Sequence, residues 1–263
     1  MKLSTENIFY EIDGKIILKN INYKFSEGKR TGIIGSNGAG KSTLLKILCL
    51  LNKKFTGNVL IDDENIKNFS RNELAKIMAI LPQERDAPID TTVRQLTSYG
   101  RFPYRKLFGG SNPKEDREAI EWALKVTQLT NFSERQVSTL SGGERQRAWL
   151  SMTLAQRPKI LLLDEPTTYL DIKHQLEVME IISEVNKKYG MSIIMVLHDL
   201  NHAKIFTDDL IVIKNQEIFK SGDPKKILTP ELVKNAFGVD ADIFKNSKGD
   251  SIIMPLKINS ESK

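Results

Sequence analysis

The sequence predicts an α/β fold, in which parallel strands are buried beneath helices. A glycine-rich stretch at residues 35–43 stands between a short apolar strand and the apolar start of a helix. The run at 160–163 is continuously apolar, which is typical of a parallel strand buried on both faces. The chain of 263 residues is 40% apolar and 27% charged, so it can bury a core as one large domain or two small lobes.

The N-terminal part, before the glycine-rich stretch, is typical of antiparallel strands. Ile21, Tyr23 and Phe25 alternate with polar neighbours, and residues 13–14 are an Asp-Gly hairpin turn. A further strand is expected at 57–62. Tyr10 precedes the glycine-rich stretch on this β layer, where its ring either stacks on an adenine or is a half-buried strand side chain.

Residues 35–42 match the phosphate-binding pattern G-x-x-x-x-G-K-[ST]. A strand, a glycine-rich loop and a helix start aim backbone N–H groups at one point, where the helix dipole adds positive charge. Lys41 is expected to reach the terminal phosphates, and the Ser42 hydroxyl to ligate Mg²⁺. The predicted nucleotide-binding loop consists of Gly35, Ser36, Asn37, Gly38, Ala39, Gly40, Lys41, Ser42 and Thr43. The sequence therefore predicts binding of a nucleoside triphosphate.

From Ser70 to about Phe132 the pattern becomes helical and irregular. Asn112 and Pro113 give a helix start with a cap and a first-position proline. The stretch 99–104 combines aromatic and basic residues, so it is either a docking surface or a loop that packs on its own helices. The sequence leaves both possibilities open.

A second helix start of the same kind follows at Ser141, Gly142 and Gly143. The helix is expected to run to Arg157 and to end at Pro158. A helix that begins with Ser-Gly-Gly offers a second anion site by the same physics as the first.

The buried strand at 160–163 ends in Asp164 and Glu165. Ligands in open α/β sheets lie at the carboxyl ends of strands, so these two carboxylates are expected to meet the phosphates. Asp164 would hold Mg²⁺ through water, and Glu165 would orient and polarise the attacking water.

Another buried strand at 192–197 ends at His198, level with Asp164 on an equivalent strand end. We therefore expect His198 to contact phosphate, whereas His174 and His202 lack such placement and receive no chemical role. An amphipathic helix that ends at Gly190 precedes this strand. The C-terminal part should contain a hairpin at 214–216, a helix capped by Thr229, and a strand pair that turns at Lys248, Gly249 and Asp250.

The net charge is +6, but the Lys and Arg residues are spread through the chain among 33 acidic residues and form no dense basic tract. We therefore expect no nucleic-acid binding. No apolar run approaches the roughly 18 to 20 residues that a membrane span needs. The N-terminus lacks an apolar signal region, which predicts a cytosolic protein. Cys49 is expected to be a small core residue in a reducing compartment.

The order of these motifs, together with Gln83 and Asp171, resembles the ATP-binding-cassette (ABC) ATPases over essentially the whole chain. The resemblance implies a P-loop NTPase fold with a RecA-like core, an N-terminal antiparallel β subdomain and an inserted α-helical subdomain. Residues 1–83 and 158–240 would form the nucleotide-binding core with the β layer. Residues 84–157 would form the helical subdomain with the signature 140–146, and 241–263 a C-terminal strand pair and tail.

In that family, Tyr10 resembles the aromatic residue that stacks on adenine. Gln83 resembles the glutamine that contacts Mg²⁺ and couples to the membrane subunit. Asp171 resembles the aspartate that communicates across the dimer, and His198 the switch histidine at the γ-phosphate. The resemblance thus implies an ATPase that uses ATP and Mg²⁺, with Lys41, Glu165 and His198 as catalytic residues. Ser42, Gln83 and Asp164 would form the metal site.

The family resemblance also implies a head-to-tail homodimer, in which ATP on one subunit's phosphate loop meets Ser141, Gly142 and Gly143 of the other. The strings at 99–103 and 166–175 resemble the importers of ferric siderophores, haem and cobalamin, most closely the siderophore branch. Such systems pair two copies of the ATPase, at the cytoplasmic face of the membrane, with two permease subunits and an external substrate-binding protein.

Two further interpretations belong to other classes of function. Soluble ABC ATPases that act on ribosomes or DNA usually carry tandem cassettes or long coiled-coil insertions, and this sequence shows neither. A nucleotide-dependent interaction module that does not hydrolyse ATP is disfavoured by Glu165 and His198. An import ATPase for an iron complex is therefore the leading prediction, with haem or cobalamin as alternative cargo.

Overall fold

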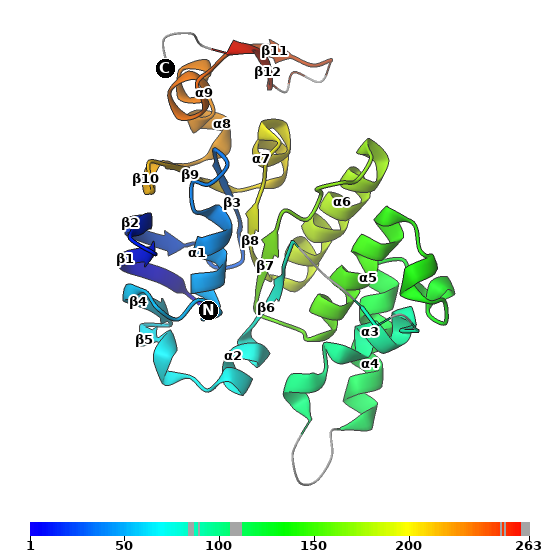
Figure 1. Ribbon diagram of the computed structural model, residues 1–263. Helices are drawn as coiled ribbons and strands as arrows, with labels where there is room; N and C mark the ends of the chain where they lie inside the picture. The colour runs from blue at the N-terminus through cyan, green and yellow to red at the C-terminus, as the bar shows by residue number, and fades with distance from the viewer. Residues whose placement is uncertain (84–86, 89, 106–111, 248, 250, 259–263) are drawn as a thin grey trace. The chain divides into compact units, whose positions relative to one another are not determined.

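The computed structural model describes residues 1–83, 87–88, 90–105, 112–247, 249 and 251–258 (Figure 1). The chain divides into two compact units. One consists of Met1 and Ile66–Ile193, and the other of Lys2–Asn65 and Ile194–Lys263. We call the first the signature unit and the second the loop unit, after the motifs that they carry, and describe each by itself.

In the loop unit, an antiparallel sheet with the strand order β2-β1-β4-β5 holds the N-terminal part. Its strands are β1 (Leu3–Ile12), β2 (Lys15–Phe25), β4 (Thr56–Ile61) and β5 (Glu64–Asn65). The predicted turn at 13–14 and the strand expected at 57–62 are confirmed, the latter with bounds shifted by one residue. Ile8, Leu18 and Ile21 are fully buried, so one face of this sheet packs into the core.

A second sheet of the loop unit carries the glycine-rich stretch. Strand β3 (Arg30–Gly35) pairs in parallel with β9 (Asp209–Lys214), which pairs antiparallel with β10 (Glu217–Gly222). Helix α1 (Lys41–Leu48) follows β3, and four of its apolar side chains are buried. The hairpin predicted at 214–216 is confirmed.

The C-terminal part of the loop unit contains α7 (Leu200–Phe206), α8 (Pro224–Ile227), α9 (Pro230–Phe237) and the strand pair β11 (Val239–Lys245) and β12 (Ser251–Ile258). The predicted cap Thr229 accepts a hydrogen bond from Leu232 N–H. Asn201 on α7 exchanges two hydrogen bonds with the backbone of Ile253, which docks β12 on this helix. Of the turn expected between the last strands, Lys248 and Asp250 lie outside the described residues.

In the signature unit, β6 (Met78–Leu81) pairs in parallel with β7 (Ile160–Asp164), so that Leu81 lies opposite Leu163. Every residue of β7 is buried, which confirms the strand expected at 160–163. Helix α2 (Arg71–Ile77) precedes β6, and α6 (Ile172–Tyr189) ends at Gly190 in the left-handed conformation, as expected. Strand β8 (Ser192–Val196) crosses the boundary between the two units.

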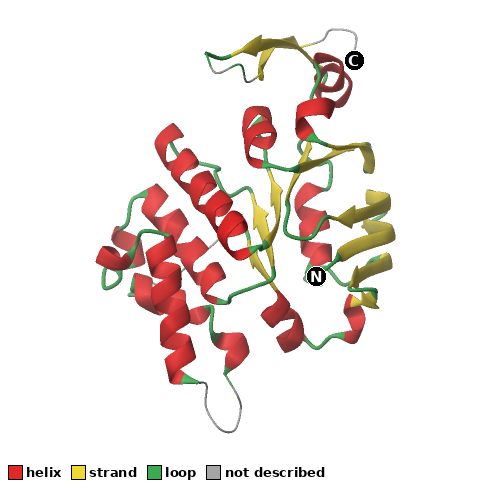
Figure 2. Cartoon of the chain, turned by 180° about the vertical axis from the view of Figure 1, so that it is seen from behind, coloured by secondary structure: helices red, strands yellow, loops and turns green. Residues whose placement is uncertain are grey.

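Three helices of the signature unit pack side by side: α3 (Val93–Tyr99), α4 (Pro113–Val126) and α5 (Gly142–Ala155) (Figure 1, Figure 2). The predicted start of α4 at Asn112 and Pro113 is confirmed. The expected end of α5 at Arg157 is wrong. The helix ends at Ala155 because Arg157 turns to a left-handed φ of 50° and its N–H bonds to Leu154 O over 2.7 Å.

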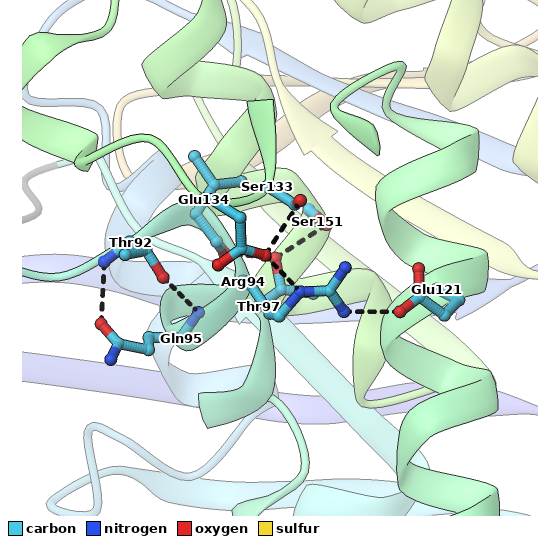
Figure 3. A network of polar contacts seen from close by, with 9 residues as sticks. Thr92, Arg94, Gln95, Thr97, Glu121, Ser133, Glu134 and Ser151 are labelled. Atoms are coloured by element: carbon cyan, nitrogen blue, oxygen red, sulfur yellow. Dashed lines mark hydrogen bonds and ion pairs between the residues drawn. The ribbon is translucent and has the colours of Figure 1, made fainter. Parts of the chain in front are cut away.

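A polar network fastens these helices to one another (Figure 3). Arg94 on α3 donates to Glu134 over 2.8 Å and to Glu121 on α4 over 2.5 Å. Thr97 on α3 donates to Ser151 on α5 over 3.1 Å, where both side chains are buried. Buried hydroxyls that pair with each other avoid the cost of unsatisfied polar groups between packed helices.

The stretch 99–104 packs in part on its own helices, and the docking surface that the sequence also allows stays a prediction. Arg101 is buried and Tyr104 donates from its hydroxyl to Gln156 O over 3.0 Å, so this part packs on its own helices. Phe102 stacks on Tyr99 yet keeps 51% of its surface exposed. Over the described ranges, we find no helix with the length and apolar character needed to cross a membrane.

Candidate functional site

The phosphate-binding loop of the loop unit requires glycine at the start of α1. Gly40 is the N-cap of that helix with a φ of 98°, in the left-handed region that favours glycine. A Cβ on Gly40 would lie 2.6 Å from Leu18 Cδ2 and 2.7 Å from Ile17 O. Only a residue without a side chain therefore allows the loop to pass this close to β2.

Lys41 folds its side chain back into the loop. Its ammonium group donates to Gly35 O over 2.9 Å and to Ser36 O over 3.0 Å, and the residue is 5% exposed. The positive charge thus lies inside the curve of the loop, at the N-terminus of α1. A helix start with a cation beside it attracts anions, so this arrangement suits a phosphate group.

Tyr10 and His198 belong to the same unit as this loop. Tyr10 lies opposite Leu18 in the β1–β2 register, and Leu18 is the residue against which Gly40 packs. His198 is exposed just beyond β8, and the preceding Leu197 donates from its N–H to Ile33 O of β3 over 3.0 Å. Both residues therefore lie near elements that form the loop, while their roles at the base and the γ-phosphate stay predictions.

In the signature unit, Glu165 is held by two side chains. Gln83 Nε2 donates to Glu165 Oε2 over 2.7 Å, and Thr168 Oγ1 donates to the same oxygen over 3.0 Å. Glu165 has a φ of 53°, a left-handed conformation that a non-glycine residue adopts at a cost. The tight turn after β7 thus orients one carboxylate oxygen by hydrogen bonds.

Asp164 and Asp171 flank this turn. Asp164 is the last residue of β7 and is 2% exposed. Asp171 is the N-cap of α6, where hydrogen bonds from the backbone and the side chain of His174 hold the pKa of its carboxyl below the usual value. The buried carboxylate of Asp164 at the strand end suits a cation. The carboxylate of Asp171 instead caps the start of α6 in this structure.

The start of α5 is closed by a capping box. Ser141 Oγ accepts from Glu144 N–H over 3.3 Å, and Glu144 Oε2 accepts from Ser141 N–H over 2.8 Å. The backbone N–H of Ser141 is the main cause that lowers the pKa of Glu144. Gly142 is exposed and Gly143 is buried, so one side of the first turn of α5 faces solvent and the other is packed.

A pocket of about 270 Å³ lies between these pieces of the signature unit. It brings together the predicted site residues Gln83, Gly142 and Glu165. Its other lining residues are Arg145, Gln146, Trp149, Thr168, Tyr169 and Leu170. Ser141, Gly143, Asp164 and Asp171 are not part of this lining, and the phosphate loop, Tyr10 and His198 belong to the other unit.

Sequence reasoning missed Thr168 and His174. Thr168 stands three residues after Glu165, and one tight turn brings two residues at this spacing into contact. This spacing is the sequence feature that indicates a role for Thr168. His174 stands three residues after Asp171, the spacing of a helix cap. Neither spacing identifies a site by itself, because capping residues are common at helix starts.

The strand–loop–helix cradle of the loop unit is typical of a nucleotide-binding α/β protein. The buried strand β7 of the signature unit, which ends at Asp164 and is followed by Glu165, is typical of the same class. The chain belongs to the ABC transporter family, whose family model matches residues 18–168. It has the fold of the ABC ATPase cassettes and is an ABC-type ATPase, as predicted.

Two curated relatives are similar over almost the whole chain. The petrobactin import ATP-binding protein FpuC of Bacillus anthracis is 44% identical over 94% of this chain and 90% of that protein. The iron(3+)-hydroxamate import ATP-binding protein FhuC of Bacillus subtilis is 44% identical over 92% of this chain and 89% of that protein. Among solved structures, a dimeric ATP-binding cassette in a post-hydrolysis state with ADP and Pi is 29% identical. It gives a TM-score of 0.73 over 86% of this chain and all of that one.

Proposed function

We propose that this chain is the ATP-hydrolysing subunit that powers uptake of a ferric siderophore through separate membrane permease subunits. The observation that carries the choice of cargo is the 44% identity, across more than nine-tenths of the chain, to subunits named for petrobactin and iron(3+)-hydroxamate import. Haem and cobalamin are the alternative cargoes. An extracellular or periplasmic substrate-binding protein would deliver the iron complex to the permease.

Lys41, Glu165 and His198 are the proposed catalytic residues. The ammonium of Lys41, which donates to Gly35 O and Ser36 O, would exchange these carbonyls for phosphate oxygens when ATP enters the loop. Glu165, oriented by Gln83 and Thr168, would position and polarise the attacking water. His198 would donate a hydrogen bond to the γ-phosphate as charge develops.

The residues proposed for Mg²⁺ have the chemistry that this ion prefers. Ser42 offers a hydroxyl in the first turn of α1, Gln83 an amide oxygen, and Asp164 a buried carboxylate, all hard oxygen donors. Bound Mg²⁺ would neutralise charge on the phosphates. Within the described residues, no group of three or more His, Cys, Asp or Glu side chains converges on one point. Mg²⁺ at nucleotide sites commonly takes few protein ligands and keeps phosphate oxygens and water as the others.

A head-to-tail homodimer accounts for two anion-binding helix starts in one chain. The ATP bound to the loop of one subunit, with the loop residues and Tyr10 as its contacts, would meet Ser141, Gly142 and Gly143 of the other subunit. Asp171 would lie at the same junction. The relative solved as a dimer with ADP and Pi supports a dimer, and the head-to-tail arrangement rests on the two anion-binding helix starts. ATP would then stabilise the dimer, and hydrolysis would release it.

This assignment implies a peripheral position at the cytoplasmic face of the membrane, because the subunit must reach its permease on the side where ATP is available. The aromatic Phe102, exposed on the signature unit, is suited to such a protein contact. We expect no nucleic-acid partner.

Uptake in cells tests the proposal directly. Cells that lack the gene are complemented with the wild-type chain or with Glu165→Gln, and labelled ferric siderophore, haem and cobalamin are offered separately. We expect only the wild type to restore uptake, and only of the siderophore. Restored uptake of haem or cobalamin instead would show that this compound, and not a siderophore, is the cargo. Restoration of uptake by Glu165→Gln would show that Glu165 is not catalytic.

A further inference from the structure

His174 makes two contacts with Asp171, the N-cap of α6. Its backbone N–H donates to Asp171 Oδ1 over 2.9 Å, and its ring nitrogen Nδ1 lies 2.8 Å from the same oxygen. A carboxylate accepts hydrogen bonds and does not donate them, so Nδ1 carries the proton in this pair. The imidazole is therefore fixed in orientation by the cap of its own helix.

The same ring lies against the start of α5. A Cβ on Gly143 would lie 2.0 Å from His174 Cδ2 and 2.4 Å from Cγ, so the imidazole fills the space where a side chain would point. The side chain of His174 is 26% exposed, and Gly143 is buried beneath it. Leu170, next to Asp171, approaches Gly142 in the same way, at 3.9 Å from the place of a Cβ.

We propose that His174 is a positioning residue that couples the first turn of α5 to the cap of α6. This inference rests on the proposed function, because Gly142, Gly143 and Asp171 are the groups that the homodimer would present at the partner's ATP. The imidazole links them as one unit: its Nδ1–H donates to Asp171, and its Cδ2 and Cγ atoms lie against Gly143. The spacing leaves no room for a side chain at position 143 while the imidazole keeps this orientation.

The coupling has a defined consequence for assembly. Backbone N–H groups of a helix start bind a phosphate well only when they already point at it, because ordering them during binding costs free energy. With the ring of His174 removed, the first turn of α5 loses its lateral support and Asp171 loses a hydrogen bond. ATP-dependent association should weaken, whereas ATP binding to the loop unit of a single chain should not.

The test measures dimerisation in the Glu165→Gln background, where hydrolysis is proposed to be blocked. Full-length protein with ATP and Mg²⁺ is followed by analytical ultracentrifugation, and the affinity of the monomer for a fluorescent ATP analogue is measured in parallel. We expect His174→Ala to raise the dimer dissociation constant about tenfold, the effect of losing roughly one hydrogen bond and its packing. The analogue should bind as before. In otherwise wild-type protein, the KM for ATP should rise more than kcat falls.

Two variants control the experiment. His202 stands at the same position after Asp199, the cap of α7, whose Oδ1 accepts from His202 N–H over 2.8 Å. Because no glycine of the signature faces it, His202→Ala should leave dimerisation unchanged. His174→Asn places an amide N–H where Nδ1 donates and an oxygen near the place of Cδ2, so it should restore most of the association.

Each outcome bears on a different claim. Dimerisation of His174→Ala at the parent's affinity, or an equal loss in His202→Ala, would overturn the positioning role while the proposed function stands. An equal loss of analogue binding in the monomer would also overturn it, because the damage would then not be confined to the signature. If the Glu165→Gln parent itself does not dimerise with ATP, the head-to-tail assembly is wrong and this inference falls with it.

Discussion

Gln83 and Glu165 face each other at the same distance beyond two paired strands. Leu81 on β6 lies opposite Leu163 on β7, and each of the two polar residues stands two positions later. The amide of Gln83 reaches the carboxylate of Glu165 over 2.7 Å. The parallel register therefore determines this contact. A displacement of Gln83 would change the hydrogen bonding of the proposed catalytic carboxylate.

Substitution of Gln83 should lower the rate of ATP hydrolysis in a graded way. Gln83→Ala removes one donor and should reduce kcat about tenfold, equal to about 1.4 kcal/mol of transition-state stabilisation. Gln83→Glu should reduce it further, because a second carboxylate would repel the first instead of donating to it. Steady-state phosphate release measures both. Wild-type rates in both variants would show that the contact with Glu165 does not matter for hydrolysis, and equal losses in the two would contradict the repulsion expected for Gln83→Glu.

Thr168 provides an independent check on the same carboxylate. Thr168→Val keeps the shape of the side chain but loses the hydroxyl that donates to Glu165 Oε2 over 3.0 Å. We expect a fall in kcat of about tenfold or more, because a hydrogen bond to a charged group contributes about 1.5 kcal/mol or more. Thr168→Ser retains the hydroxyl and should keep most of the rate. A Ser variant as slow as the Val variant would assign the loss to packing.

The phosphate loop, the strand β7 and the helix caps could be predicted because each depends on neighbours in sequence. Gly40 precedes Lys41 at a helix start, and the apolar residues of β7 stand together. The contact between Gln83 and Glu165 could not be predicted, because it depends on the register of strands that are far apart in the chain. The contact between His174 and Gly143 depends on the packing of two helices, which no local pattern records. The sequence predicts the end of α5 two residues too late, because Pro158 indicates that a helix stops but not where its last turn ends.

Lys41→Ala should abolish measurable binding of ATP. The variant removes the only charge that the loop itself places inside its curve, where Lys41 donates to Gly35 O and Ser36 O. A point charge at the β- and γ-phosphates contributes strongly to affinity in phosphate loops. Binding of a fluorescent ATP analogue measures the loss. An affinity equal to that of the wild type would remove Lys41 from the nucleotide site.

Arg101→Ala should destabilise the helices of the signature unit. The guanidinium donates from Nε to Asp116 over 2.8 Å and from Nη1 to Ala155 O over 2.9 Å, and its side chain is only 5% exposed. Removal leaves a mostly buried carboxylate without this partner, which costs about 3 to 5 kcal/mol. Arg101→Lys should recover only part, because an ammonium cannot make both bonds in the same fork. Urea unfolding gives the values, and a loss below about 1 kcal/mol would contradict the importance of this pair.

Cys49 should react slowly with thiol reagents in the folded protein. It follows the last turn of α1, where burial raises the pKa of its thiol to about 11 despite hydrogen bonds from nearby backbone N–H groups and the charge of Lys46. Only the thiolate reacts, so the native protein should be alkylated hundreds of times more slowly at pH 8 than the unfolded chain, whose thiol has a pKa of about 8.5. The native rate should rise about tenfold for each unit of pH between 7.5 and 9.5, because the thiolate fraction rises by that factor below the pKa. Intact-mass measurements after iodoacetamide treatment follow the reaction, with protein in denaturant as the control. Equal rates in the native and denatured samples at pH 8 would show that the thiol is not shielded by the fold.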